Sequence, residues 1–236
     1  MVEISCHIQF HTHGTKEDVA LLKEQFSKCD LYVPEIANPR PRFRRQIYRL
    51  ANGDIPFSDF MGNNIAPIHW TPDRYWYNFY KMIADSQKTL FIMERPWQGV
   101  SMNSVQVKGR EARSLYQEGR TNLAIEVYKE FLLTFASNTK LRDDYLVTNF
   151  ARRLRDKIRR TPSLSKKKLV RVFMSIGMQH EPIFERIATQ LPTNCTKEVV
   201  EGSAEGVTNL FWEISQRMVY QDYIPTDNDI LQLLSR

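Results

Sequence analysis

The first 35 residues alternate between strand and helix patterns, and this order constrains the fold more than any other feature. Val2–Phe10 mixes apolar and polar residues with a period near two, as a strand does, and Leu31–Val33 is a second short strand that Pro34 ends. Between them, Lys16–Lys28 has apolar residues at helical spacing and acidic residues in its first turn. A strand–helix–strand order predicts parallel pairing and a right-handed crossover. We therefore expect an α/β fold with a small, mostly parallel central sheet and flanking helices.

Further strands and helices are expected along the rest of the chain. Thr89–Met93 and the very apolar Lys168–Ile176 predict the third and fourth strands. The chain from 38 to 72 is rich in Pro, Gly, Asn and Arg, so we expect an irregular excursion with one short helix at Arg44–Leu50. A helix with an aromatic face is predicted at Asp73–Asp85.

The middle of the chain predicts a helical insertion, at roughly 108–160. Within it we expect helices at Glu111–Gln117, Asn122–Ala136 and Asp143–Arg160, with breaks at Gly119 and after Ala136. A weakly defined stretch follows Pro192, and helices are expected in the C-terminal part, at roughly 200–236. We interpret the whole chain, 1–236, as a single α/β domain.

Composition and cysteine content predict a cytoplasmic protein. With 42% hydrophobic residues the chain can bury a core. We expect no membrane insertion, because apolar stretches such as Leu169–Ile176 are far shorter than the ~20 residues of a spanning helix. Cys6, Cys29 and Cys195 form no CxxC pair, which argues against a zinc ribbon or a disulfide framework and favours reduced thiols. The start of the chain lacks the basic and apolar regions of a secretory signal.

The formal net charge of +6 favours an anionic partner or substrate. Most of the excess comes from arginines between Arg40 and Arg49 and from the segment Arg152–Arg171. We do not expect nucleic-acid binding, because aromatic and basic residues do not alternate as they do on base-stacking surfaces.

Ionisable side chains follow all four predicted strands. In a parallel α/β sheet, functional residues gather at the carboxyl ends of the strands, because the loops there open on one edge. The residues are His11 and His13 after the first strand, Glu35 after the second, Glu94 and Arg95 after the third, and His180 after the fourth. The sequence therefore predicts one site at this edge, while His7 and His69 are expected to be structural.

These segments, in this order, resemble the TraB/PrgY/Tiki branch of the TraB/Tiki/ChaN/EreA-like superfamily. The likeness is carried by the first GxxH-like element at Phe10–Thr15, the strand ending in glutamate at Asp30–Glu35, the Glu-Arg strand end at Phe91–Pro96, the helical segment at Tyr116–Gly119 and the second GxxH element at Val172–His180. Phe10 stands where the family has glycine, and Glu94 where aspartate is usual.

The resemblance implies a metal-dependent hydrolase that cleaves a peptide or ester bond. His13, Glu35 and His180 would hold a divalent ion (Zn, Mn or Co), with His11 as an additional ligand candidate. Two imidazoles and one carboxylate are a familiar ligand set for such an ion. Glu35 would also act in catalysis, or as a general base without metal.

Arg95, at the same edge, could have either of two roles. Beside the metal it would act as an anion clamp or oxyanion partner, a role that suits its rigid donor fork. Its alternative is a structural salt bridge to Glu35 or Glu94. The substrate would be a small molecule or a peptide, and the sequence does not indicate the oligomeric state.

Two other functions stay open. One is a non-catalytic binding or regulatory member of the same superfamily that takes haem or a peptide, which Phe10 favours because a bulky residue could crowd the turn. The other is a PHP- or amidohydrolase-like metal hydrolase, because the His11-Thr12-His13 pattern also opens those metal sites.

Overall fold

The computed structural model describes residues 2–11, 16–36, 39–93, 102–191, 194–200 and 207–235. The chain divides into two compact units, which are described separately. The first unit comprises Met1–Glu94 and Leu146–Ser203, and the second comprises Arg95–Tyr145 and Ala204–Arg236. The predicted insertion and C-terminal helices supply most of the second unit, but residues 146–160 of the insertion belong to the first unit. The single-domain assignment made from the sequence stays a prediction.

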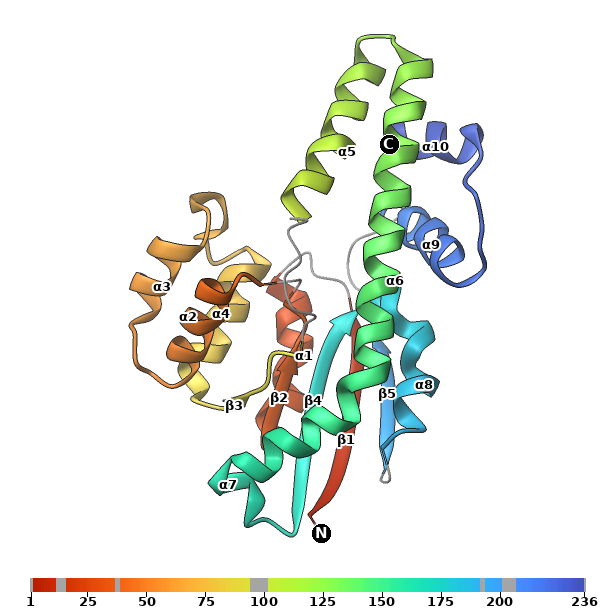
Figure 1. The fold of residues 1–236 in the computed structure, drawn as a ribbon. Helices are drawn as coiled ribbons and strands as arrows, with labels where there is room; N and C mark the ends of the chain where they lie inside the picture. Colours follow the sequence, from red (N-terminus) through yellow and green to blue (C-terminus); the bar gives the residue numbers. More distant parts are fainter. Residues whose placement is uncertain are drawn as a thin grey trace. The chain divides into compact units, whose positions relative to one another are not determined.

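The first unit is built on a parallel sheet, which confirms the predicted α/β fold class (Figure 1). The described residues form five strands in the order β3-β2-β4-β1-β5. The strands are β1 (Glu3–His11), β2 (Leu31–Pro34), β3 (Thr89–Leu90), β4 (Leu169–Gly177) and β5 (Cys195–Val200).

The position of β4 corrects one expectation. β1 and β2 are parallel but do not pair with each other, because β4 lies between them and pairs with both. β4 is the most apolar strand, and a strand in the middle of a parallel sheet is buried on both faces. The carboxyl ends of β1, β4 and β2 are therefore direct neighbours.

β5 was not predicted from the sequence, which indicated only a weakly defined stretch there. Its four central residues are exposed, and it pairs with β1 alone among the described strands. Polar, charged residues such as Lys197 and Glu198 are typical of an edge strand, where they discourage pairing with other chains.

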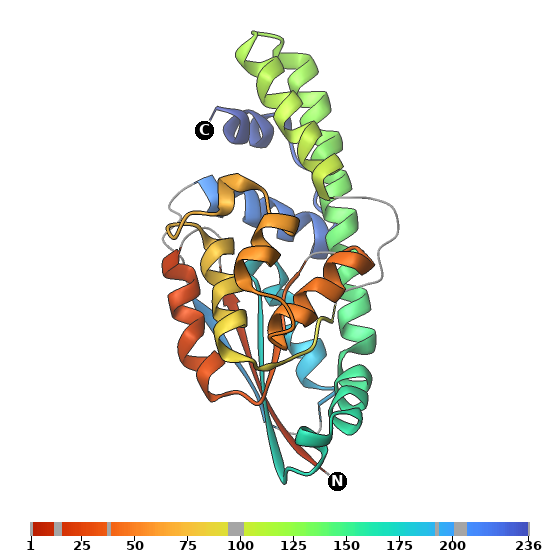
Figure 2. The same cartoon turned by 90° about the vertical axis from the view of Figure 1, so that its left-hand side faces the viewer.

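Four helices lie together on one side of the sheet (Figure 2). They are α1 (Lys16–Lys28), α2 (Pro41–Ala51), α3 (Phe57–Asn64) and α4 (Tyr75–Ser86), with the 3-10 turn η1 (Pro67–His69) between the last two. Their apolar side chains share a core with Tyr32 and Phe173 of the sheet. The expected irregular excursion was thus wrong for α3, whose Phe60 and Met61 are buried, and α2 is longer than predicted because Pro41 suits a first helical turn.

The C-terminal half of α6 (Thr121–Arg160) and α8 (Phe184–Ala188) lie on the other side of the sheet (Figures 1 and 2). α7 (Pro162–Ser165) leads into β4, and the 3-10 helix η2 (Met178–Ile183) leads out of it.

The second unit is helical. It contains α5 (Met102–Gln117), α6 up to Tyr145, α9 (Val207–Tyr220) and α10 (Asp227–Leu234) around an aromatic core. Gly119 has a φ of 76° and ends α5 in the left-handed conformation that glycine favours, so the predicted break there is confirmed. The predicted break after Ala136 is wrong, because α6 continues without interruption for 40 residues. None of the described helices is long and apolar enough to cross a membrane.

Candidate functional site

Glu35 and His180 lie together at the carboxyl edge of the sheet. Oε1 of Glu35 is 3.3 Å from Nε2 of His180, and their side chains are 7% and 0% exposed. An ionisable pair buried this deeply is costly to desolvate and is found mainly where it has a structural or chemical role. The structure thus brings together two of the predicted site residues.

Gly177 links the ends of three neighbouring strands around this pair. Its backbone N–H donates to Oε2 of Glu35, and the backbone N–H of Glu35 donates to the Ser175 carbonyl at 2.9 Å. On its other side, Gly177 is in register with His11, the last residue of β1. Strand pairing therefore places the ends of β1, β4 and β2 next to one another, as the strand-end argument predicted.

Gln179 contacts the same imidazole. Its side-chain nitrogen is 3.1 Å from Nε2 of His180. A side chain at Gly177 would displace the Gln179 amide from its present position, so the glycine leaves room for this amide beside the histidine.

His11 is buried at the end of β1 and faces helix α4. Its ring lies 6.2 Å from the ring of Tyr75, centroid to centroid, and its side chain is on the sheet side opposite to its neighbour Phe10. Phe10 packs edge-on against Phe184 of α8 at 6.5 Å. The bulky residue in the first motif therefore fills the core against α8.

Tyr75 lies beside His11 and feels the charges of Glu35 and Asp18. Burial, and then the negative charges that Tyr32 and Glu35 can carry, raise the pKa of Tyr75 well above its ordinary value, and Asp18 acts in the same direction. Its hydroxyl therefore stays protonated and can donate a hydrogen bond at any physiological pH. Tyr75 is 3% exposed and Asp18 only 1%, so both belong to the interior of this edge.

Three of the residues at this edge, Asp18, Tyr75 and Ser175, were not predicted from the sequence. Asp18 had a visible signal, because it lies four residues before Leu22 and eight before Phe26, on the apolar face of α1, where an aspartate is unusual. Tyr75 and Ser175 gave no such signal, because a tyrosine on an aromatic helix face and a serine in an apolar strand have ordinary structural uses. Ser175 bonds to the hydroxyl of Tyr32 at 2.6 Å, beside the backbone carbonyl that holds Glu35.

The other predicted site residues cannot be placed with this pair. His13, Glu94 and Arg95 lie outside the described residues. Within the described ranges, no group of three His, Cys, Asp or Glu side chains is arranged to hold a metal ion. A third protein ligand for the pair Glu35 and His180 would therefore have to come from elsewhere, and His13 is the sequence-based candidate.

The donor geometry of the pair itself fits a divalent ion. Two N or O ligands on a tetrahedral zinc ion, each at about 2.0–2.2 Å, are about 3.3–3.5 Å apart. The 3.3 Å between Glu35 Oε1 and His180 Nε2, which make an ion pair when the imidazole is protonated, matches this separation.

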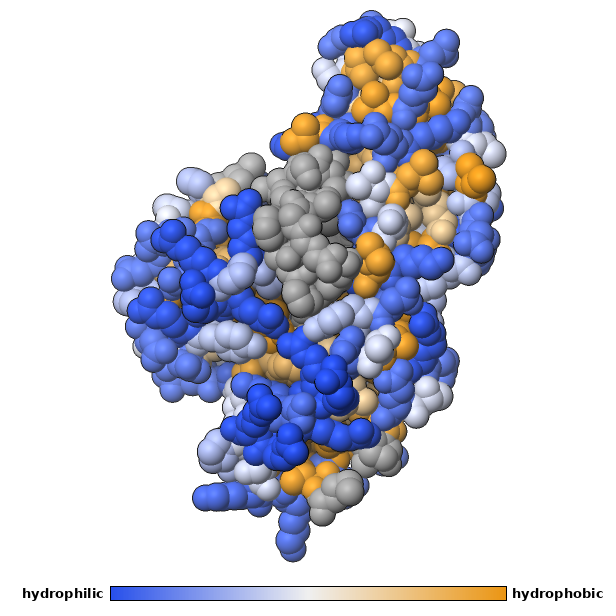
Figure 3. All heavy atoms as spheres, viewed as in Figure 1, coloured by the Kyte–Doolittle hydropathy of each residue, from blue (hydrophilic) through white to orange (hydrophobic). Residues whose placement is uncertain are grey.

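The two basic segments of the sequence meet beside the end of β3. The Arg44 guanidinium donates to the carbonyl of Ile92, Arg153 lies over the ring of Phe91 at 5.7 Å, and Lys157 lies over the ring of Tyr48 at 5.8 Å. Burial lowers the pKa of Lys157. Hydrophilic side chains gather over α2 and over the C-terminal half of α6 (Figure 3). Arg44 of the first basic segment and Arg153 and Lys157 of the second thus lie near one another on the first unit, and we call these three residues the basic surface.

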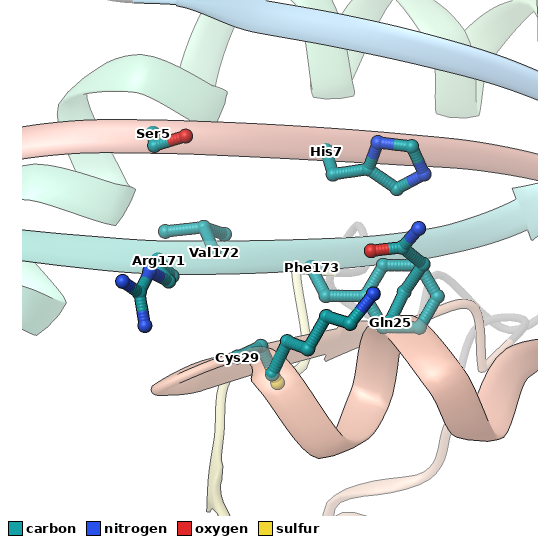
Figure 4. Close-up of a pocket in the computed structure, with 8 residues that line it drawn as sticks. Ser5, His7, Gln25, Cys29, Arg171, Val172 and Phe173 are labelled. Carbon is teal, nitrogen blue, oxygen red and sulfur yellow. The ribbon is translucent and has the colours of Figure 1, made fainter.

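A separate groove of about 390 Å³ lies between α1 and strands β1 and β4 (Figure 4). His7 lines it, held by Thr196 at 3.0 Å and Glu198 at 3.1 Å and stacked on Phe173. These contacts fix the His7 imidazole on the sheet, and its expected structural role stays a prediction. Gln25 and His7 reach toward each other across the groove (Figure 4).

Comparison of the chain with protein-family models, with curated proteins and with solved structures finds no match in any of the three.

Proposed function

We propose that this chain is a cytoplasmic, metal-dependent hydrolase that resembles the TraB/PrgY/Tiki branch and acts on a peptide or ester bond. The observation that carries the proposal is the buried pair of Glu35 and His180, whose ligand atoms are 3.3 Å apart at the carboxyl edge of a parallel sheet. His13, which follows the neighbouring strand β1, would complete a two-histidine, one-carboxylate set.

Each residue has a distinct role in this proposal. A bound Zn, Mn or Co ion would lower the pKa of bound water towards ~7 and polarise the substrate carbonyl. The Gly177 N–H holds one oxygen of Glu35, and the other oxygen faces His180, where the two side chains would share a metal ion or a proton. His180 is fixed by burial and by Gln179. Arg95 would bind an anionic group of the substrate or the oxyanion.

The basic surface supports an anionic substrate. Arg44 donates to the carbonyl of Ile92, near the end of β3, so a cationic side chain lies on the same unit as the pair Glu35 and His180. Positive charge around a cleft raises the local concentration of anionic substrates. We therefore favour a peptide or small molecule that carries a carboxylate or phosphate.

Metal-dependent stabilisation tests the proposal directly. The chelator-treated full chain is titrated with Zn²⁺, Mn²⁺ and Co²⁺ while its thermal unfolding is followed. One of these ions should stabilise the protein by about 2.7 kcal/mol at a hundredfold excess over Kd. The gain should disappear in His13→Ala, Glu35→Gln and His180→Ala and persist in His7→Ala, which removes a histidine that also pairs with a glutamate. The same metal should restore hydrolysis of an ester or a peptide carrying acidic residues.

The other outcomes separate the alternatives. If no ion stabilises the folded protein, the proposal is wrong. Metal binding without hydrolysis would indicate a non-catalytic member, and a haem absorption band on titration would indicate the haem-binding alternative. Metal binding that needs His11 and His13 but survives loss of Glu35 and His180 would favour the PHP-like site. Hydrolysis that needs Glu35 but no metal would indicate a general base.

A further inference from the structure

Two of the three cysteines lie side by side on neighbouring strands. Cys6 of β1 and Cys195 of β5 are direct partners in the parallel register. Adjacent strands lie about 4.7–4.9 Å apart, which is within the Cα separation of about 4.4–6.8 Å that disulfides span. Cys29 lies at the end of α1, and its thiol donates to the Phe26 carbonyl instead.

The two thiols differ in their access to solvent. Cys6 is 1% exposed, whereas Cys195 is only partly buried. The neighbouring Cys6 thiol lowers the pKa of Cys195, although burial and the Glu185 carboxylate oppose this effect. Cys195 is therefore the thiol that ionises first and that a small oxidant reaches first, since the thiolate is the reactive form.

The edge position of β5 allows the two sulfurs to approach. A disulfide needs Cβ atoms about 3.5–4.5 Å apart, somewhat closer than the strand spacing. Among the described strands β5 pairs only with β1, and its residues from Thr196 to Val199 are exposed. A small shift of β5 towards β1 would therefore disturb few packed side chains.

We propose that Cys6 and Cys195 are a site of reversible oxidative modification, at which hydrogen peroxide joins β1 to β5 through a disulfide. The Cys195 thiolate attacks one oxygen of the peroxide, the O–O bond breaks, and hydroxide leaves and is protonated to water. Cys195 is then a sulfenic acid. The Cys6 sulfur attacks the Cys195 sulfur, the S–O bond breaks, and the departing hydroxide takes the Cys6 proton to form the second water. Two thiols are oxidised by two electrons and the peroxide is reduced to two waters.

Peptide mapping after oxidation tests this site without any assumption about the metal. The full chain is treated with hydrogen peroxide in the presence of a chelator, remaining thiols are alkylated, and the product is analysed by mass spectrometry without reduction. The expected product is a monomer that has lost two hydrogen atoms, contains a Cys6–Cys195 linked peptide and has an alkylated Cys29. A dithiol reductant should restore all three thiols.

Single-cysteine variants identify the order of the two steps. Cys195→Ser should leave Cys6 reduced, and Cys6→Ser should stop at a Cys195 sulfenic acid that dimedone labels. Cys29→Ser is the matched control and should form the disulfide at the wild-type rate. Because Cys6→Ser changes a buried residue, the folding of this variant is checked by circular dichroism. If Cys6→Ser does not fold, the result for Cys195→Ser decides the test.

Three results would overturn the proposal. They are a folded wild-type chain that forms no intramolecular disulfide, a disulfide that includes Cys29, and a cross-link that forms only between two molecules.

Discussion

His180 and Glu35 face each other at 3.3 Å inside the protein, although they belong to segments that lie far apart in the sequence. His7 and Glu198 make a second histidine–glutamate pair at 3.1 Å, but there the side chains are 25% and 44% exposed. The same two residue types thus form one pair in the interior and one at the surface of a single sheet. The two pairs should differ in their contribution to stability, because water screens only the second.

Glu35→Gln should destabilise the metal-free protein by about 1.5–3 kcal/mol, the usual value of a hydrogen bond to a charged group. The carboxylate contacts Gly177 N–H with one oxygen and His180 with the other, whereas a carboxamide has only one acceptor oxygen. Glu198→Gln is the matched control and should cost less than about 1 kcal/mol. Urea unfolding of the two variants measures both values, and equal losses would show that burial does not strengthen the inner pair.

Tyr32 and Ser175 should be energetically coupled. Their hydroxyls are 2.6 Å apart and buried next to the carbonyl that holds Glu35. Tyr32→Phe or Ser175→Ala alone leaves one buried hydroxyl without its partner and should cost about 1–3 kcal/mol. The double variant should cost less than the sum of the single ones by about 0.5–3 kcal/mol. Additive losses in a double-mutant cycle from urea unfolding would contradict a bond between these hydroxyls.

The sequence predicted which edge of the sheet carries the candidate site, because the residues that end a strand are local signals. Pro34 ends β2 and Gly177 ends β4, so the neighbouring Glu35 and His180 could be assigned to one edge. Their direct contact could not be predicted, since it depends on β4 pairing with β2. Strand order is a long-range property, and the strand–helix–strand pattern alone wrongly indicated pairing of β1 with β2.

Other parts were missed because tertiary contacts outweigh local preference. The sequence indicated a break in α6 after Ala136, where Ser137, Asn138 and Thr139 are weak helix formers. In the structure Thr139 is buried and Asp143 accepts a hydrogen bond from the Tyr220 hydroxyl, so packing in the second unit holds the helix through this segment. β5 was not predicted because its exposed edge residues lack the apolar pattern of a buried strand.

The start of α10 should make the second unit sensitive to acid. Burial alone would raise the pKa of Asp229, but the hydroxyls of Tyr223 and Thr226 and the Thr226 N–H donate to its carboxylate and hold the pKa below its usual value. An aspartate has a pKa of about 3.9 in the unfolded chain. Because the pKa of Asp229 is lower in the folded protein, its carboxylate stabilises the fold at pH values above about 3.9, and this stabilisation is lost as the pH falls through the folded-state pKa. Asp229→Asn should therefore be less stable than wild type at pH 7, and this difference should shrink below about pH 4.

Thr226→Ala is the comparison for this pH effect. It removes the side chain that accepts the Asp229 N–H in the capping box and should cost about 0.5–2 kcal/mol. That backbone bond does not titrate, so most of its loss should persist in acid. Urea unfolding of both variants from pH 7 to pH 3 makes the measurement, and a loss in Asp229→Asn that stays constant would contradict a depressed pKa.

Ser137→Pro should distinguish a continuous α6 from two helices joined by a turn. Proline removes a backbone N–H and collides with the carbonyl one turn before it, which costs about 3 kcal/mol or more inside a helix. Ser137 is exposed and lies in the middle of the 40-residue helix, so the loss would come from the backbone and not from lost packing. Ser137→Ala at the same position should be neutral or stabilise by up to about 0.5 kcal/mol. Urea unfolding followed by circular dichroism at 222 nm measures both variants. A proline that costs less than about 1 kcal/mol would indicate a turn at this position, since turns accept proline readily.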